Sequence, residues 1–126
     1  MFPAPVVLVG DHAAAIAAVG VGRPVTLLSP PGAAGRLGAL WWWVLAEAAR
    51  ARASAPVADL LDCADAPGHA MAALRCGCRG LVLARGPGFA RVAAAAASLG
   101  AEVLDSRPPA MTILDWRAGD ARAAPR

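Results

Sequence analysis

The sequence predicts an α/β domain with a mainly parallel, five-stranded sheet. Short apolar runs alternate with helical stretches along the 126 residues. The runs are continuously apolar and do not alternate with polar residues, which is typical of parallel strands covered on both faces. The length is typical of one hydrophobic core, so residues 1–126 are expected to form a single three-layer domain whose last residues, 118–126, fray.

Local signals mark the ends of each expected element. In chain order these elements are a strand at 5–10, a helix at 12–19, a strand at 25–28, a helix at 35–52, a strand at 57–63, a helix from 65 to about 77, a strand at 80–84, a helix at 88–99 and a strand at 101–105. Asp11 is a natural N-cap for the first helix, and Gly20 with Pro24 ends it. Pro67 behind Asp65 marks another helix start.

Periodicity does not settle the order of the strands in the sheet. The order 2-1-3-4-5 of flavodoxin-like domains and the order 3-2-1-4-5 of Rossmann-like dinucleotide-binding domains both fit, and we expect the first. After the fifth strand, residues 106–109 lead into another extended run at 110–116. A parallel crossover needs a dozen or more residues. This run is therefore expected to be an antiparallel edge strand, an arm across the domain, or a segment that pairs with another subunit.

Missing residue types exclude several classes of enzyme. The chain contains no Lys, Asn, Gln or Tyr. Without Lys it can form neither a Schiff base nor the Gly-rich phosphate loop that ends in Lys, and the kinase scheme built on a strand Lys is also excluded. Reductase chemistry based on a Tyr-Lys pair is excluded as well. The sequence identifies no cofactor.

Charge and hydropathy argue against nucleic acid and membrane as partners. The net charge is +3, but the arginines are spread from Arg23 to Arg126 and interleaved with aspartates, whereas a phosphate-binding groove needs clustered cations. The longest apolar stretches, at 13–22 and 37–46, are about half the roughly 20 residues that a membrane span requires. The N-terminus lacks the pattern of a signal peptide. Three cysteines without a secretion signal indicate reduced thiols and a cytoplasmic protein.

In an open parallel sheet, ligands bind beyond the carboxyl ends of the strands. The catalytic candidates that follow the expected strands are Asp11, His12, Asp62, Cys63 and His69. His69 could act as a base toward Cys63, although the nearby carboxylates oppose a thiolate. Asp11, Asp62 and Asp65 could instead gather Mg²⁺. No zinc site is expected, because Cys63 and the pair Cys76 and Cys78 lie at opposite ends of a helix, about 15 Å apart.

Three loops carry Pro-Gly at a helix start: Pro31-Gly32, Pro67-Gly68 and Pro87-Gly88. Helix N-termini favour anions by roughly 0.3 to 1 kcal/mol each in exposed settings. A small anionic ligand is therefore expected at the carboxyl ends of the strands. The alternative is that Pro and Gly only form the turns that connect each strand to the following helix. The predicted anion-binding residues are Ser29, Gly32, Gly35, Arg36, Arg85, Gly86 and Gly88.

Three consecutive tryptophans, at positions 41–43, stand in the long expected helix. Neighbouring helix positions differ by about 100°, so the three side chains cannot all face one core. The spacing predicts a buried stripe that consists of Leu37, Leu40, Trp41, Val44, Leu45 and Ala48. Large exposed apolar surface usually marks an interface, so Trp42 and Trp43 are expected at the contact of a homodimer or beneath the terminal segments of the same chain.

These features favour a self-associating, non-catalytic module that binds a small anionic ligand at the carboxyl ends of the strands. The alternative is a small enzyme with a metal-assisted or Cys-His site built from the five catalytic candidates. A nucleic-acid or scaffold role ranks third.

Overall fold

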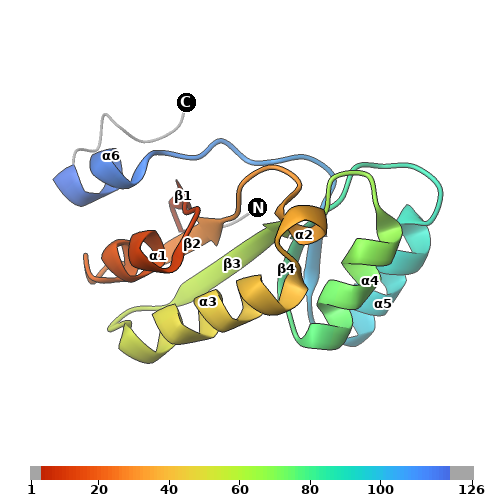
Figure 1. The fold of residues 1–126 in the computed structure, drawn as a ribbon, viewed down its shortest axis with the longest axis horizontal. Helices are drawn as coiled ribbons and strands as arrows, with labels where there is room; N and C mark the ends of the chain where they lie inside the picture. The colour runs from red at the N-terminus through yellow and green to blue at the C-terminus, as the bar shows by residue number, and fades with distance from the viewer. Residues whose placement is uncertain (1–3, 120–126) are drawn as a thin grey trace.

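The computed structural model describes residues 4–119 and contains one sheet of five parallel strands (Figure 1). The strands are β1 (Val6–Leu8), β2 (Val25–Leu28), β3 (Val57–Asp62), β4 (Gly80–Val82) and β5 (Glu102–Leu104). The strands are mainly apolar, although β3 also contains Asp59 and Asp62 and β5 begins with Glu102. The predicted α/β class with a parallel, five-stranded sheet is confirmed.

The helices follow the strands in alternation. They are α1 (His12–Val19), α2 (Ala33–Arg36), α3 (Ala39–Arg52), α4 (Pro67–Cys76), α5 (Phe89–Ser98) and α6 (Ile113–Ala118). The single helix predicted at 35–52 is divided into α2 and α3, because Gly38 has a φ of 94° that other residues rarely adopt. Within residues 4–119, no helix is both long and apolar enough to cross a membrane.

The strands lie in the sheet in chain order, β1-β2-β3-β4-β5, and every neighbouring pair is parallel. This order differs from both predicted orders, because no strand is inserted between two others. Crossovers between parallel strands are right-handed in about 98% of cases. Since each crossover here moves one strand further in the same direction, all crossover helices fall on the same face of the sheet.

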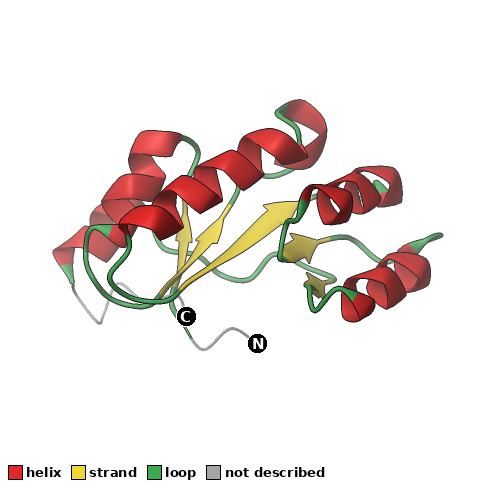
Figure 2. Cartoon of the chain, turned by 90° about the horizontal axis from the view of Figure 1, so that it is seen from below, coloured by secondary structure: helices red, strands yellow, loops and turns green. Residues whose placement is uncertain are grey.

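The domain therefore has two layers, not the predicted three (Figure 2). The strand residues that face the helices include Val7, Leu27, Leu61 and Leu81, and all are fully buried. They form one core cluster with residues of α1, α3, α4 and α5. The helix layer thus covers one side of the sheet from β1 to β5.

The other face of the sheet carries a separate buried cluster of Val6, Leu28, Leu60 and Val82. Residues 106–112, which we call the arm, return along the carboxyl ends of the strands on the side away from the helices (Figure 2). At the far edge, the arm forms one parallel bridge to β1 through Met111, whose N donates to Val6 O at 2.9 Å.

The segment predicted as extended at 110–116 is therefore an arm followed by a helix. The bridge at Met111 is parallel, so no antiparallel edge strand forms there. From Ile113 the chain is helical, because Thr112 caps α6 and accepts a hydrogen bond from Asp115 N at 3.1 Å. The predicted frayed tail, 118–126, lies outside the described residues from 120 onward.

α6 docks on α1 through one buried tryptophan. Trp116 Nε1 donates to Ala18 O at 2.8 Å. The guanidinium carbon of Arg23 lies 4.2 Å from the centre of the Trp116 ring, and its Nη2 donates to Trp116 O at 3.1 Å. These contacts fix α6, near the end of the described chain, to α1 near its beginning.

The close approach of β3 and β4 at Gly80 leads to a test of the sheet. A Cβ at Gly80 would overlap the carbonyl oxygen of Asp59, whereas a Cβ at Gly86 would meet nothing within 4 Å. We expect Gly80→Ala to lower the free energy of unfolding by about 2 kcal/mol or more, and Gly86→Ala to change it by less than about 0.5 kcal/mol. Urea denaturation measures both, and equal effects would contradict the packing of β3 against β4.

Candidate functional site at the carboxyl ends of the strands

Ser29 directly follows β2 and Asp62 ends the neighbouring strand β3, and both are buried. Arg107 of the arm reaches them, and its Nη1 donates to Asp62 Oδ2 at 2.7 Å and to Ser29 O at 2.9 Å. Ser29 Oγ accepts from Asp62 N at 2.9 Å, and Asp62 Oδ1 accepts from Ala64 N at 2.7 Å. The polar groups of these two residues therefore hold the arm and the turn after β3.

Cys63 points into the helix-side core, where its side chain is buried. Its Sγ lies 3.7 Å from Leu61 O. Burial, reinforced by the nearby charge of Asp62, raises the pKa of the thiol to about 12. Because the thiolate is the nucleophilic form, the protonated thiol at neutral pH is a poor nucleophile.

The other three catalytic candidates lie at the starts of two helices, α1 and α4. Asp11 caps α1 and accepts from Ala14 N at 2.7 Å, while His12 is exposed at the start of that helix. His69 is exposed on the first turn of α4, and a Cβ at Gly35 would lie 2.8 Å from its Cε1. Among residues 4–119, no three His, Cys, Asp or Glu side chains are grouped so that they could hold a metal ion. The described part of the chain thus does not assemble a metal-assisted site from these candidates.

The predicted anion-binding residues divide between two helix starts. Gly32 is the N-cap of α2, and Gly35 is the third of its four residues. Arg36 Nη1 donates to Pro31 O at 3.3 Å within the same turn. Arg36 is therefore already engaged, and α2 is too short for a substantial helix dipole.

The second group lies where α4 and α5 begin side by side. A Cβ at Gly88 would lie 3.0 Å from Pro67 Cβ and Cγ. Neither helix has a side-chain cap or an acidic residue in its first turn, whereas α1 and α6 are capped by side chains. The first-turn amide groups of two neighbouring helices therefore lack the side-chain acceptor that capped helices have.

Arg85 supplies a cation beside these two helix starts. Its guanidinium carbon lies 4.6 Å from the centre of the Phe89 ring, and its Nε donates to Asp105 Oδ2 at 3.0 Å. This ion pair is exposed to solvent, so it contributes little to stability. Gly86 is exposed in the same loop, and its carbonyl oxygen accepts from Phe89 N at 3.1 Å.

Trp42 is fully buried, which contradicts its predicted place at an interface. Its Nε1 lies 3.4 Å from Asp59 Oδ1 and donates to it. A buried indole N–H needs an acceptor, and Asp59 on β3 provides one. Trp42 is therefore the tryptophan that is buried in the core, whereas the sequence predicted Trp41 in the buried stripe. Trp43 is half-buried, and its place at an interface stays a prediction.

The stripe predicted as buried on α3 and the residues before it is buried only in part: Leu45 is buried as predicted, whereas the other aliphatic side chains larger than alanine face solvent. The buried residues of this helix are Trp42, Leu45, Ala46 and Ala49. Leu37 is 48% exposed, Leu40 is 64% exposed and Val44 is 51% exposed. The exposed apolar surface that suggested a homodimer is therefore present, but on different side chains.

An ion-pair network inside the domain was not predicted from the sequence. Asp59 faces the helices and pairs with Arg50 Nη2. Arg50 Nη1 also donates to Glu47 Oε2 at 3.0 Å, and its Nε donates to Val57 O at 3.2 Å. The signal was available, because an aspartate within an apolar strand needs a partner.

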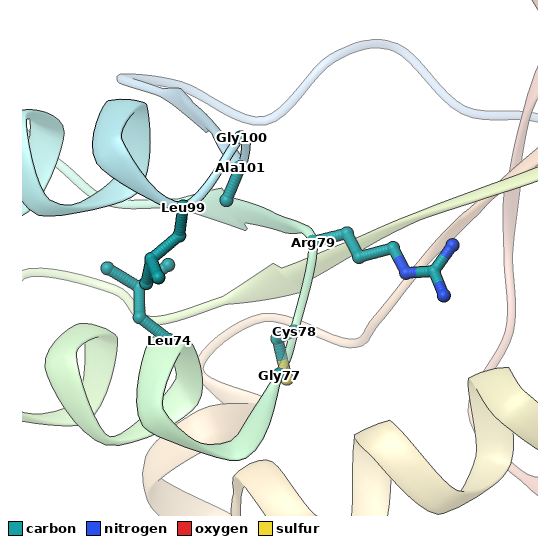
Figure 3. Close-up of a pocket in the computed structure, with 7 residues that line it drawn as sticks. All are labelled: Leu74, Gly77, Cys78, Arg79, Leu99, Gly100 and Ala101. Carbon is teal, nitrogen blue, oxygen red and sulfur yellow. The ribbon is translucent and has the colours of Figure 1, made fainter.

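A hollow of about 310 Å³ lies at the opposite, amino-terminal edge of β4 and β5 (Figure 3). The side chains of Leu74 and Leu99 face each other in it, while Arg79 extends away from them. Cys78 also lines the hollow, and burial, with a smaller contribution from Asp59, raises the pKa of its thiol to about 12. The hollow is mainly apolar, and its thiol is protonated at neutral pH.

No protein-family model and no curated protein sequence matches the chain. The geometry of the described residues therefore carries the functional interpretation.

The raised thiol pKa values predict how the three cysteines react. Cys63 and Cys78 are buried, whereas Cys76 is half-buried. A pKa near 12 leaves very little thiolate at pH 8, so iodoacetamide should alkylate Cys76 at least about tenfold faster than Cys63 or Cys78 in the folded protein. Peptide mass spectrometry after timed labelling measures this. Rapid alkylation of Cys63 at pH 7 would contradict its assignment as a core thiol and favour a nucleophile.

Proposed function

We propose that this domain is a cytoplasmic, non-catalytic module that binds a small oxyanion at the carboxyl ends of the strands and works as a self-associated assembly. One observation carries the anion site, namely the adjacent, uncapped starts of α4 and α5 with Arg85 beside them. The three free cysteines support a reducing compartment.

The physics of the two helix starts favours a negative charge. Each helix N-terminus carries the equivalent of about half a positive charge, and the first-turn N–H groups point outward as donors. An oxyanion would accept from them and would compete with Asp105 for the guanidinium of Arg85. Because the site is exposed, we expect a weak affinity, on the order of millimolar.

The non-catalytic part of the proposal rests on how the catalytic candidates are used. Asp62 binds Arg107, Asp11 caps α1, and the thiol of Cys63 is buried and protonated at neutral pH. These residues are occupied with structural contacts. The alternative, a small enzyme with a metal-assisted or Cys-His site, has no comparable support.

Inorganic phosphate is the first ligand to test. We expect phosphate to raise the melting temperature relative to chloride at equal ionic strength, because a ligand that binds only the folded state stabilises it. Arg85→Gln should remove most of this increase. Arg75→Gln, at an exposed position in the last turn of α4, should preserve it.

Differential scanning fluorimetry of the three proteins over a phosphate series measures the effect. If the increase is the same in all three, phosphate acts as a general salt and the proposed anion site is wrong.

A further inference from the structure

The outer face of α3 exposes large apolar side chains along its first half. Leu40 is 64% exposed and Val44, one turn further, is 51% exposed, while exposed Leu37 lies just before the helix. α1 packs beside α3 and adds exposed Ala13 together with half-buried Ile16 and Ala17. We call this combined surface the α1–α3 face. A helix that is apolar on its outer side as well as its inner side is normally covered.

We propose that the α1–α3 face is the self-association surface, and that two copies pack with their α3 helices antiparallel about a two-fold axis. The inference rests on the self-association in the proposed function and adds the surface, the partner and the orientation. The partner is a second copy of this chain.

The sizes of the side chains along α3 favour the antiparallel arrangement. Leu40 and Val44 stand on the amino-terminal half of the outer face, and the small residues Ala48 and Ala51 stand on the carboxyl-terminal half. An antiparallel pair centred near residue 46 sets Leu40 opposite Ala51 of the second copy and Val44 opposite Ala48. Large side chains then meet small ones twice by symmetry, as a two-fold interface requires.

The charges favour the same arrangement. Arg52 ends α3 and is exposed. In a parallel pair the two Arg52 side chains would meet, and like charges opposed across an interface are unfavourable. In the antiparallel pair each Arg52 falls near the first turn of the other α3, which contains no charged side chain. Glu47 is directed toward Arg50 and Arg79 and so adds no charge to the centre of the face.

The helices on either side of α3, which are α1 and α4, also favour the antiparallel arrangement. An antiparallel two-fold arrangement sets α1 against α1 of the second copy, so that alanines meet alanines and the helices can approach closely. A parallel two-fold arrangement would set α1 against α4, which exposes His69 and Arg75. Only the antiparallel pair therefore sets the apolar surface of α1 against another apolar surface.

The size of the face predicts a weak dimer. α3 is about 21 Å long at 1.5 Å per residue, and α1 is about 12 Å long, which gives a contact on the order of 400 Å² per copy. Stable complexes bury about 800 Å² per partner. We therefore expect a dimer that dissociates on dilution within the micromolar range.

Sedimentation equilibrium over a series of protein concentrations tests the surface. Leu40→Glu should raise the dimer dissociation constant by at least about tenfold, because it places a charge in an apolar contact. Leu99→Glu is the matched control, since Leu99 is also 64% exposed but lies at the end of α5, away from the face. Circular dichroism and the melting temperature confirm that both variants fold.

A mixture of two variants tests the orientation. Ala51→Arg alone should also weaken the dimer, but mixing it with Leu40→Glu should restore association, because the antiparallel pair brings the two introduced charges together. If restoration fails although each variant alone dissociates, the antiparallel orientation is wrong.

Two further outcomes separate this inference from the proposed function. If the unmodified protein dimerises and Leu40→Glu has no effect, the α1–α3 face is wrong while self-association stands. If the unmodified protein is monomeric at every concentration, both the surface and the proposed self-association are wrong.

Discussion

Right-handed crossovers between strands that lie in chain order place every crossover helix on one face of the sheet, and the rest of the structure follows from this constraint. α1, α3, α4 and α5 share one core with the inner residues of the strands. Parallel sheets are normally covered on both faces, so the second face needs other cover. The arm lies on that side, and α6 at its end is fastened to α1 by Trp116.

Arg107 is the contact that holds the start of the arm, and it changes how the carboxyl ends of the strands should be interpreted. Its partner Asp62 is almost fully buried, with 6% of its side chain exposed. A buried carboxylate is costly unless it is paired and hydrogen-bonded, and the carboxylate of Asp62 has both a cation, Arg107, and a hydrogen bond from the backbone N of Ala64. Asp62, which resembles a catalytic group in the sequence, thus serves with Ser29 to hold β2, β3 and the arm together. The proposed anion site is instead at the start of α4 and α5.

Local signals predict most elements but not their assembly. The apolar run at 25–28 is a strand with the predicted ends, and Pro67 starts α4 as expected. Strand order could not be predicted, because it depends on which strands become neighbours and not on any one run. The inward turn of Trp42 depends on Asp59, which lies 17 residues further along the chain. Arg107 and Asp62 are 45 residues apart, so their pairing is equally invisible to local patterns.

Asp62 is a structural residue that holds the arm through Arg107, and a double-mutant cycle of these two residues tests this role most directly. The free energies of unfolding of the unmodified protein, Asp62→Asn, Arg107→Gln and the double variant give the coupling between the two side chains. We predict that each single variant is destabilised and that the coupling is at least about 1 kcal/mol, because the pair is largely buried. A coupling near zero would contradict the account and would return Asp62 to the catalytic candidates.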